Sequence, residues 1–255
     1  MANGWDHDIN LAMLTDFYEI TMSNAYYKEG MKDTVAVFDM FFRDVPERGG
    51  FAIMAGVEQL VEYLANLQFT DKDIEYLVQL DHFDPAFLSY LRDFRFECDV
   101  WAIPEGMPIF PGEPIVKVRG PIIQAQMVET MVLLTINHQS LIATKSSRIV
   151  RAAEGRGILE FGARRAQGSD ASILGARAAY IAGVAGTSCT VAGEIFKIPV
   201  LGTMAHSWVQ AFDTEYDAFK AYATVYPDDC QLLVDTYNTL KCGVPNAIRV
   251  SREVL

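Results

Sequence analysis

The sequence predicts an α/β fold with two regions. A mixed α+β domain over residues 1–135 precedes the first part of a TIM-type α/β barrel over residues 136–255. Two observations predict this division. Helical and alternating apolar patterns are mixed in the first region, whereas short apolar strands alternate with helices after residue 155. That alternation is typical of parallel βαβ units, and polar residues at several strand ends favour a barrel, whose catalytic groups follow the strands.

Composition and charge argue against several classes of protein. Of the 255 residues, 51% are hydrophobic, which is enough for a sizeable core. A net charge of −12 without a basic tract argues against broad nucleic-acid binding, although local arginines can still bind a small phosphorylated ligand. The four cysteines have no CxxC spacing, so we expect no disulfide framework or zinc site. No signal peptide or membrane span is visible, and we expect a cytoplasmic protein.

The first region begins with an expected helix over residues 14–27, which Thr15 or Asp16 can cap. Residues 34–42 alternate and are rich in β-branched and aromatic side chains, which predicts a strand. Thr70 is expected to cap the second of three further helices. These helices cover residues 54–67, 71–80 and 85–94.

A proline-rich stretch and a long helix follow. Residues 98–122 hold five prolines and three glycines between short apolar runs, which predicts a small β subdomain. Residues 121–153 are largely apolar and predict a long helix that joins the two regions, with a break expected near Asn137.

The second region has a regular rhythm of strands and helices. Strands are expected over residues 158–162, 186–190, 198–204 and 230–236. Helices are expected over residues 170–183, 191–197, 206–212, 215–226, 238–244 and 246–255. Four strands are about half of what a closed eight-stranded barrel needs. No GxGxxG or Walker loop is present, so the common nucleotide-binding motifs are not indicated.

Polar residues after these four strands are the candidates for chemistry. His206 follows the third strand, and it is either a buried core histidine or a nucleophile toward a phosphoryl group. Arg164 and Arg165 follow the first strand, and they either form a solvated surface or bind a carboxylate or phosphate. The residues alone leave both pairs of alternatives open.

Five stretches together carry a resemblance to a known family. In chain order they are "LTDFYEITM", "EFGARRAQG", "GTSCT", "GTMAHSWV" and "LLVDTYNT". With this order and spacing the chain resembles nicotinate phosphoribosyltransferase over its whole length. The resemblance implies an irregular, type II phosphoribosyltransferase-like barrel after an N-terminal mixed domain. It also implies NAD salvage: nicotinate and phosphoribosyl pyrophosphate give nicotinate mononucleotide and pyrophosphate, coupled to ATP hydrolysis with Mg²⁺.

The resemblance assigns roles to residues near the strand ends. It implies that His206 accepts the ATP γ-phosphate as a phosphohistidine, and that Asp235 either orients this ring or lies near the pyrophosphate and its Mg²⁺. Phe161 would stack on the pyridine ring, Arg164 would face the carboxylate or phosphates, and Arg165 would support it.

Further roles concern specificity, phosphate and assembly. Ser188 can donate to the nicotinate carboxylate, where nicotinamide-using relatives carry an aspartate. Thr203 and Arg43 are phosphate-binding candidates. Tyr18 would cover the pyridine from a second subunit, which implies a homodimer with composite sites. His138 is expected to be structural, whereas His7 and His82 are expected at the surface.

Family members continue beyond Leu255, into a strand with an "RxDSGD"-like motif and glycine-rich phosphate loops. We therefore expect a truncated chain that corresponds to the N-terminal half to two-thirds of the enzyme. Two other hypotheses stay open. One is a catalytically incomplete half-barrel with exposed apolar surface. The other is a different barrel enzyme, such as a metal-dependent hydrolase that uses His206 and Asp235.

Overall fold

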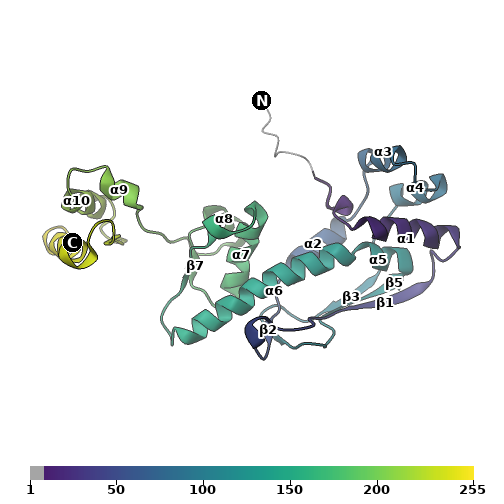
Figure 1. Cartoon of the computed structure of the whole chain (residues 1–255), viewed down its shortest axis with the longest axis horizontal. Coiled ribbons are helices and arrows are strands. Elements are labelled where there is room, and N and C mark those ends of the chain that lie inside the picture. The colour runs from purple at the N-terminus through teal and green to yellow at the C-terminus, as the bar shows by residue number, and fades with distance from the viewer. Residues whose placement is uncertain (1–8) are drawn as a thin grey trace.

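The computed structural model describes residues 9–255, so the surface position expected for His7 lies outside the described residues. Figure 1 shows an elongated arrangement of three parts. A small sheet and its covering helices lie at one end, a long helix crosses the middle, and the last helices form a lobe at the other end. Within the described part, the helices are too short or too polar to cross a membrane.

The N-terminal part is built on an antiparallel sheet. Its strands run in the order β1 (Val35–Met40), β5 (Val116–Pro121) and β3 (Asp99–Ala102), with Phe38 opposite Val118. The strand expected over residues 34–42 is thereby confirmed. The stretch expected to form a small β subdomain, residues 98–122, supplies β3, β4 (Pro108–Ile109) and β5. It is not a separate subdomain, because β5 pairs with β1 and β4 pairs antiparallel with β2 (Ala52–Ile53).

Helices pack around this sheet and bury a large apolar core that includes Phe87, Phe94 and Ile123. They are α1 (Phe17–Lys28), α2 (Val57–Asn66), α3 (Asp71–Gln79) and α4 (Pro85–Arg92). Thr70 caps α3 as predicted, because its hydroxyl accepts from the Asp73 amide while the Asp73 carboxylate accepts from the Thr70 amide.

The start of α1 differs from the prediction. Asp16 is the N-cap residue, but its side chain makes no capping hydrogen bond. The Thr15 hydroxyl instead donates to the carboxylate of Glu19, which is fully buried and also accepts from the Thr130 hydroxyl at 2.6 Å. The polar residues at this terminus therefore join α1 to the helix that contains Thr130.

The long connecting helix is broken at a different place from the one predicted. It divides into α5 (Ile122–Met127) and α6 (Glu129–Ala152), with Val128 at φ −98° and ψ 0° between them. The break expected near Asn137 is wrong: Asn137 is exposed and lies within the continuous helix α6. The predicted boundary between residues 135 and 136 therefore falls inside α6.

A buried arginine joins the N-terminal part to the barrel part. Arg177 lies on α7 (Ser169–Ile181), is 8% exposed, and donates to both oxygens of Glu105 at 2.9 and 2.7 Å. It also donates to Glu58 and, at 3.3 Å, to Gln139 of α6. Although burial opposes ionisation of Glu105, Arg177 and two backbone amides hold the pKa of that carboxyl below its usual value.

Those two amides belong to the start of α2. The Glu105 Oε1 atom accepts from Gly56 N at 2.6 Å and from Val57 N at 3.0 Å, so one carboxylate caps α2 and pairs with α7. Gly56 has φ +103°, and a Cβ there would lie 2.8 Å from the Thr135 carbonyl oxygen. Only glycine combines that backbone conformation with such a close approach of α2 to α6.

The barrel part begins with two short parallel strands, β6 (Leu159–Glu160) and β7 (Gly186–Thr187), with α8 (Thr190–Phe196) after the second. The next expected strand is reduced to one parallel bridge between Thr187 and Val200. These three segments are parallel and adjacent in chain order, as βαβ units require.

The strand expected over residues 230–236 is wrong. No strand forms there, and the segment is attached at Gln231, whose carbonyl accepts from the Thr203 hydroxyl at 2.7 Å. Its apolar residues, Leu232, Leu233 and Val234, pack on the C-terminal helices, which removes them from the sheet edge.

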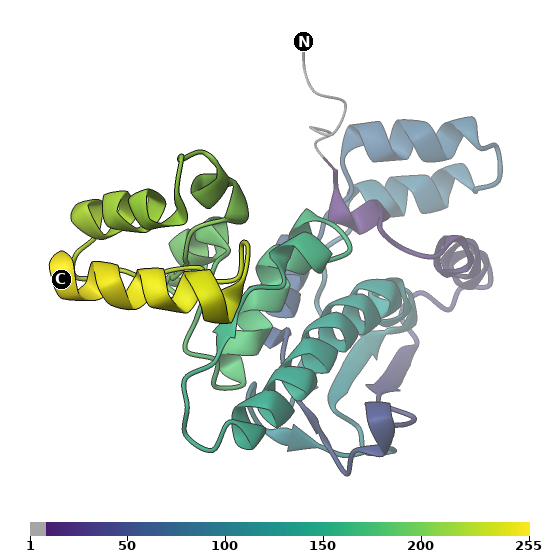
Figure 2. The same ribbon diagram turned by 60° about the vertical axis from the view of Figure 1, so that its left-hand side comes forward.

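The C-terminal lobe has a core of its own around Val209, Phe219 and Val250. Figure 2 shows its two longest helices lying side by side. The elements of the lobe are α9 (His206–Gln210), α10 (Glu215–Val225), the short helix η4 (Thr239–Gly243) and α11 (Val244–Glu253).

Replacement of Arg177 tests the importance of its ion pair. Because Arg177→Gln leaves the Glu105 carboxylate buried without its cation, we expect the free energy of unfolding to fall by about 3 kcal/mol. The matched control is Arg92→Gln, which breaks the exposed Arg92–Asp71 pair and is expected to cost less than about 1 kcal/mol. Urea unfolding followed by circular dichroism measures both, and equally small losses would contradict this role.

Candidate active site

The carboxyl ends of the parallel segments meet along one edge. Ser188 N donates to the Glu160 carbonyl at 3.0 Å, and Leu201 N donates to the Thr187 carbonyl at 3.0 Å. The loops after β6, after β7 and after Val200 therefore start side by side. This is the edge at which α/β sheets bind their ligands.

Glu160 shapes the first of these loops. Its Oε2 accepts from the buried Thr187 hydroxyl at 2.7 Å, and its Oε1 accepts from the Gly162 amide. One carboxylate thereby ties β6 to β7 and turns the chain that follows. No role was predicted for Glu160, although an acid at the end of the apolar run "ILEFG" was a signal for one.

The loop after β6 presents the residues expected to bind substrate. Phe161 is 48% exposed, and Arg164 and Arg165 are exposed in a short 3-10 turn. Of the two arginines, Arg165 lines a pocket of about 350 Å³ between this loop, α6 and α7, whereas Arg164 does not. The arginine expected only to support its neighbour is therefore the one that faces this pocket.

His138 on α6 lines the same pocket. It is half-buried, and burial lowers the pKa of its imidazole, so the ring is neutral near pH 7. A neutral imidazole can both donate and accept a hydrogen bond. The structure places His138 at the wall of a pocket, where the sequence predicted only a structural role.

His206 is the first residue of α9, and its ring is exposed. Its Nδ1 lies 3.2 Å from the Thr236 hydroxyl, which is the hydrogen-bond partner that the structure gives this ring. The structure therefore pairs His206 with the hydroxyl of Thr236 and not with the expected carboxylate of Asp235. Asp235 is exposed and directly precedes Thr236 in the chain. Thr236 was not among the predicted site residues, and the pair "DT" after an apolar run was the available signal for it.

Two further candidates lie along the same edge. The side chain of Ser188 is exposed at the end of β7, with its backbone held by Glu160. The Thr203 hydroxyl proton is donated to the Gln231 carbonyl at 2.7 Å. Thr203 therefore links the loop after Val200 to the segment that contains Asp235 and Thr236.

Tyr18 and Arg43 are not brought to this edge. Tyr18 lies on α1, which Figure 1 places at the end of the N-terminal part away from β7. Its hydroxyl donates to Glu129 at 3.0 Å, and desolvation and this carboxylate raise the pKa of Tyr18 to about 12, yet its side chain stays 44% exposed. Arg43 is exposed in the loop after β1.

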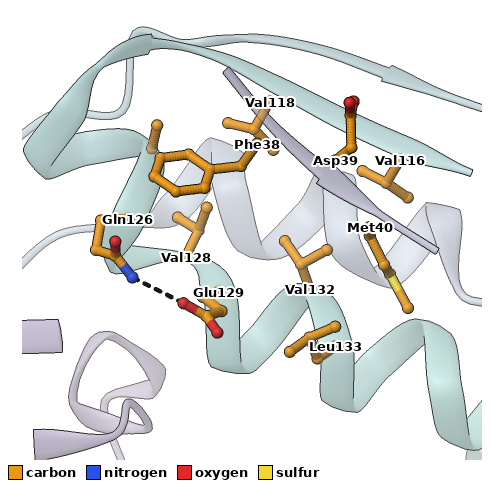
Figure 3. A pocket seen from close by; sticks show the side chains of 11 residues that line it. Phe38, Asp39, Met40, Val116, Val118, Gln126, Val128, Glu129, Val132 and Leu133 are labelled. Atoms are coloured by element: carbon orange, nitrogen blue, oxygen red, sulfur yellow. Dashed lines mark hydrogen bonds between the residues drawn. The ribbon is translucent and has the colours of Figure 1, made fainter. Parts of the chain in front are cut away.

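Figure 3 shows a separate pocket of about 340 Å³ between the antiparallel sheet and helices α5 and α6. Phe38, Met40 and Val132 form its apolar walls, and a hydrogen bond of 2.7 Å joins Gln126 to Glu129 at one end. The charged side chains that line it are carboxylates, so it is unsuited to the anionic substrates that the resemblance implies.

Clusters of metal-ligating side chains are absent from residues 9–255, where no three His, Cys, Asp or Glu residues are arranged to hold an ion. The hypothesis of a metal-dependent hydrolase at His206 and Asp235 gains no support from this geometry. A single exposed carboxylate can still share a Mg²⁺ ion with substrate phosphates.

Comparisons with known proteins bear on this arrangement. Residues 13–137 match the model of the nicotinate phosphoribosyltransferase N-terminal domain. The chain is 49% identical over 243 residues to a nicotinate phosphoribosyltransferase of Mycobacterium tuberculosis. The aligned residues cover 95% of this chain and 52% of that protein. A Bacillus subtilis nicotinate phosphoribosyltransferase is 46% identical over 246 residues, with 96% and 50% covered. The chain belongs to the nicotinate phosphoribosyltransferase family.

Solved structures agree with this assignment. The crystal structure of human nicotinic acid phosphoribosyltransferase superposes with a TM-score of 0.87 at 31% identity, over 94% of this chain and 58% of the human chain. A Pyrococcus furiosus nicotinate-nucleotide pyrophosphorylase, at 23% identity and a TM-score of 0.73, shares the fold. The predicted fold class, a mixed domain followed by the first part of the barrel, is confirmed. The chain spans about half the length of the curated relatives it matches.

The contact between His206 and Thr236 makes a testable prediction. Thr236→Val removes the hydroxyl beside Nδ1, so phosphoramidate should modify Nδ1 more often relative to Nε2 than in the wild-type chain. We expect the ratio of the two phosphohistidine isomers to change roughly fivefold, as the loss of a hydrogen bond of about 1 kcal/mol implies. Phosphorus NMR distinguishes the isomers, with His206→Ala identifying the signal. Thr236→Ser should behave as wild type, and an unchanged ratio in Thr236→Val would exclude this contact in solution.

Proposed function

We propose that this chain supplies the N-terminal domain and the active-site strand ends of an enzyme that joins nicotinate to phosphoribosyl pyrophosphate. The products are nicotinate mononucleotide and pyrophosphate, and ATP hydrolysis is coupled to their formation. The observation that carries the proposal is the exposed His206 ring beside the strand-end edge, in a chain of this family. Thr236 holds its Nδ1, and within residues 9–255 the structure shows no hydrogen bond to Nε2.

His206 would act as a nucleophile in the ATP-dependent step. With a proton on Nδ1 donated to the Thr236 hydroxyl, the lone pair of Nε2 is available to attack. A bond forms between Nε2 and the γ-phosphorus while the bridging P–O bond breaks, and ADP leaves with the electron pair. Water later cleaves the phosphohistidine to release phosphate. Thr236 would therefore be a positioning residue for this step.

The glycosyl transfer needs no protein nucleophile. The bond between the ribose and its pyrophosphate breaks as the pyridine nitrogen approaches, so the site must hold both groups and stabilise the leaving pyrophosphate. When bound, Mg²⁺ would neutralise part of that charge. The exposed carboxylate of Asp235 fits this ion, because Mg²⁺ in such sites takes one or two carboxylates together with substrate phosphates.

Nicotinate would lie against the loop after β6. Phe161 offers an exposed aromatic face for the pyridine ring, and a guanidinium of Arg164 or Arg165 can bind its carboxylate through two hydrogen bonds. The pocket position of Arg165 favours it for part of this role. Ser188 can donate a further hydrogen bond to the carboxylate.

A homodimer with composite sites accompanies this proposal. Tyr18 lies on α1, away from the strand ends of its own chain, and its ring is 44% exposed. Its hydroxyl is held by Glu129, which fixes the ring in position. Tyr18 would therefore cover the pyridine ring in the site of a second subunit.

The second candidate is a catalytically incomplete half-barrel. It is favoured by coverage of about half of each relative, and by a barrel sheet reduced to β6, β7 and one bridge at Val200. Such a chain would need a complementary half before it could complete the reaction, because an open sheet edge offers unpaired backbone groups.

One experiment tests both candidates. The chain is incubated with γ-labelled ATP, and nicotinate mononucleotide is measured after nicotinate, phosphoribosyl pyrophosphate and Mg²⁺ are added. We expect the label on His206 and its loss in His206→Ala, with His82→Ala as the matched control that keeps it. Product formed only after co-expression with the C-terminal half of the Bacillus subtilis relative would identify the incomplete half-barrel. Absence of label and product in every combination would contradict the proposed function.

Ser188→Asp tests the preference for nicotinate. An aspartate at this position repels the nicotinate carboxylate but accepts from the amide of nicotinamide. In the active preparation we expect kcat/KM for nicotinate to fall by a factor of about 100, as a loss of about 3 kcal/mol implies, while activity with nicotinamide rises. Ser188→Ala is the control, with a smaller loss and no gain. Equal losses for both substrates would argue against a role in specificity.

A further inference from the structure

A third pocket, larger than the two described above, lies outside the strand-end site. It has a volume of about 750 Å³ and is bounded by residues 10–14 and by helices α2, α6 and α7. It adjoins the pocket of Arg165, with which it shares His138, Gln167 and Ala171. Its size is within the range typical of small-molecule sites.

Most of the wall is apolar. The larger contributors are Leu11, Leu14, Leu67, Met131, Leu134 and Leu174. Met131 and Leu67 are buried, so they form the floor, whereas Leu134 is 50% exposed and lies near the mouth. Such a wall suits the flat apolar body of a ligand.

Two buried hydroxyls line this pocket as well. Tyr63 is 8% exposed and Thr135 is 9% exposed, and neither hydroxyl has a hydrogen-bond partner within the part of the chain that is described. Neither oxygen is among the described side-chain atoms that lack both a partner and solvent contact, and both residues line the pocket. Because a hydroxyl can both donate and accept a hydrogen bond, these two groups can bind a polar atom of a ligand in the pocket.

The charge of the lining limits the class of ligand. Its ionised side chains are the carboxylates of Glu62 and Asp170, and no Lys or Arg of the described residues lines it. His138, the remaining titratable base in the lining, is held neutral by burial. An anion would meet only negative charge here, so nicotinate and phosphoribosyl pyrophosphate are excluded as occupants.

We propose that this pocket is a second small-molecule site, distinct from the strand-end site, for a neutral or monocationic aromatic compound. The apolar walls would enclose the ring, and Tyr63 and Thr135 would bind its polar group. A positive charge on the ligand would be directed toward Glu62 and Asp170 at the rim. The proposal does not depend on the activity proposed for the strand ends.

Three probes of one shape isolate the effect of charge. Benzamide is neutral, benzamidine is a cation and benzoate is an anion, yet all three carry the same ring. Each is titrated into the chain labelled at its methionine methyl groups, and the methyl signals are followed by NMR. Met131 reports on this pocket, and Met40 reports on the pocket of Figure 3.

We expect benzamide and benzamidine to shift the Met131 signal with dissociation constants in the millimolar range, which is usual for fragments of this size. Benzoate should shift it at least about tenfold more weakly, because it meets the two carboxylates. The Met40 signal should not follow the same titration curve. Benzoate bound at the strand-end arginines would leave Met131 unchanged, which separates the two sites.

Two neighbouring leucines of α6 provide a matched pair of variants. Leu134→Trp fills the mouth of the pocket and should abolish the Met131 shift. Leu133→Trp places the same bulk on the adjacent residue, which lines the pocket of Figure 3, and should leave that shift intact. Both leucines are more than 40% exposed, so both variants are expected to fold. Thr135→Val keeps the shape of the side chain, removes its hydroxyl and should weaken benzamide roughly fivefold.

Three results would overturn the proposal. The first is a Met131 signal that no probe shifts. The second is a shift by benzoate as strong as that by benzamide, which would show that the carboxylates do not select the ligand. The third is a benzamide shift that survives Leu134→Trp or is lost equally in Leu133→Trp, which would place the compound elsewhere.

Discussion

The ion pair between Arg177 and Glu105 is the interaction on which the rest of the structure depends. It is buried and bidentate, and the same carboxylate caps α2. Because Arg177 lies on α7, the pair fixes the helix that follows the β6 loop against the N-terminal part. Gly56 lets α2 approach α6 closely enough for this contact. Helices α6 and α7, which these residues hold in place, line both the pocket of Arg165 and the larger pocket of about 750 Å³.

The strand-end site is assembled by two kinds of contact. Main-chain hydrogen bonds align the loops after β6, after β7 and after Val200. Side-chain hydrogen bonds attach the last segment, through Thr203 to Gln231 and through His206 to Thr236. A ladder repeats along two strands, whereas these two bonds act singly, and packing of residues 232–234 on the C-terminal helices also holds the segment.

The sequence allowed prediction of features that are encoded locally. The alternation of residues 34–42 and the acids after Thr70 identified β1 and the α3 cap, because both depend on near neighbours in the chain. The helix breaks at Val128, which is buried in the N-terminal core, and residues 232–234 pack on the C-terminal helices where a strand was expected. Periodicity records neither of these contacts. For the site, the motifs located the loops, but the choice of Thr236 as partner of His206 and of Arg165 as pocket wall required side-chain directions in space.

The separate core of the C-terminal lobe has a mechanical consequence. His206 begins α9, which shares the lobe core of Val209 and Phe219, whereas Ser188 and Arg165 follow the parallel strands β7 and β6. A rigid tilt of the lobe about residues 201–205 would change the distance from the imidazole to the pocket of Arg165 and leave the lobe interior intact. Under the proposed function, residues 201–205 would therefore set the spacing between His206 and the loops that hold substrate, with every helix left intact.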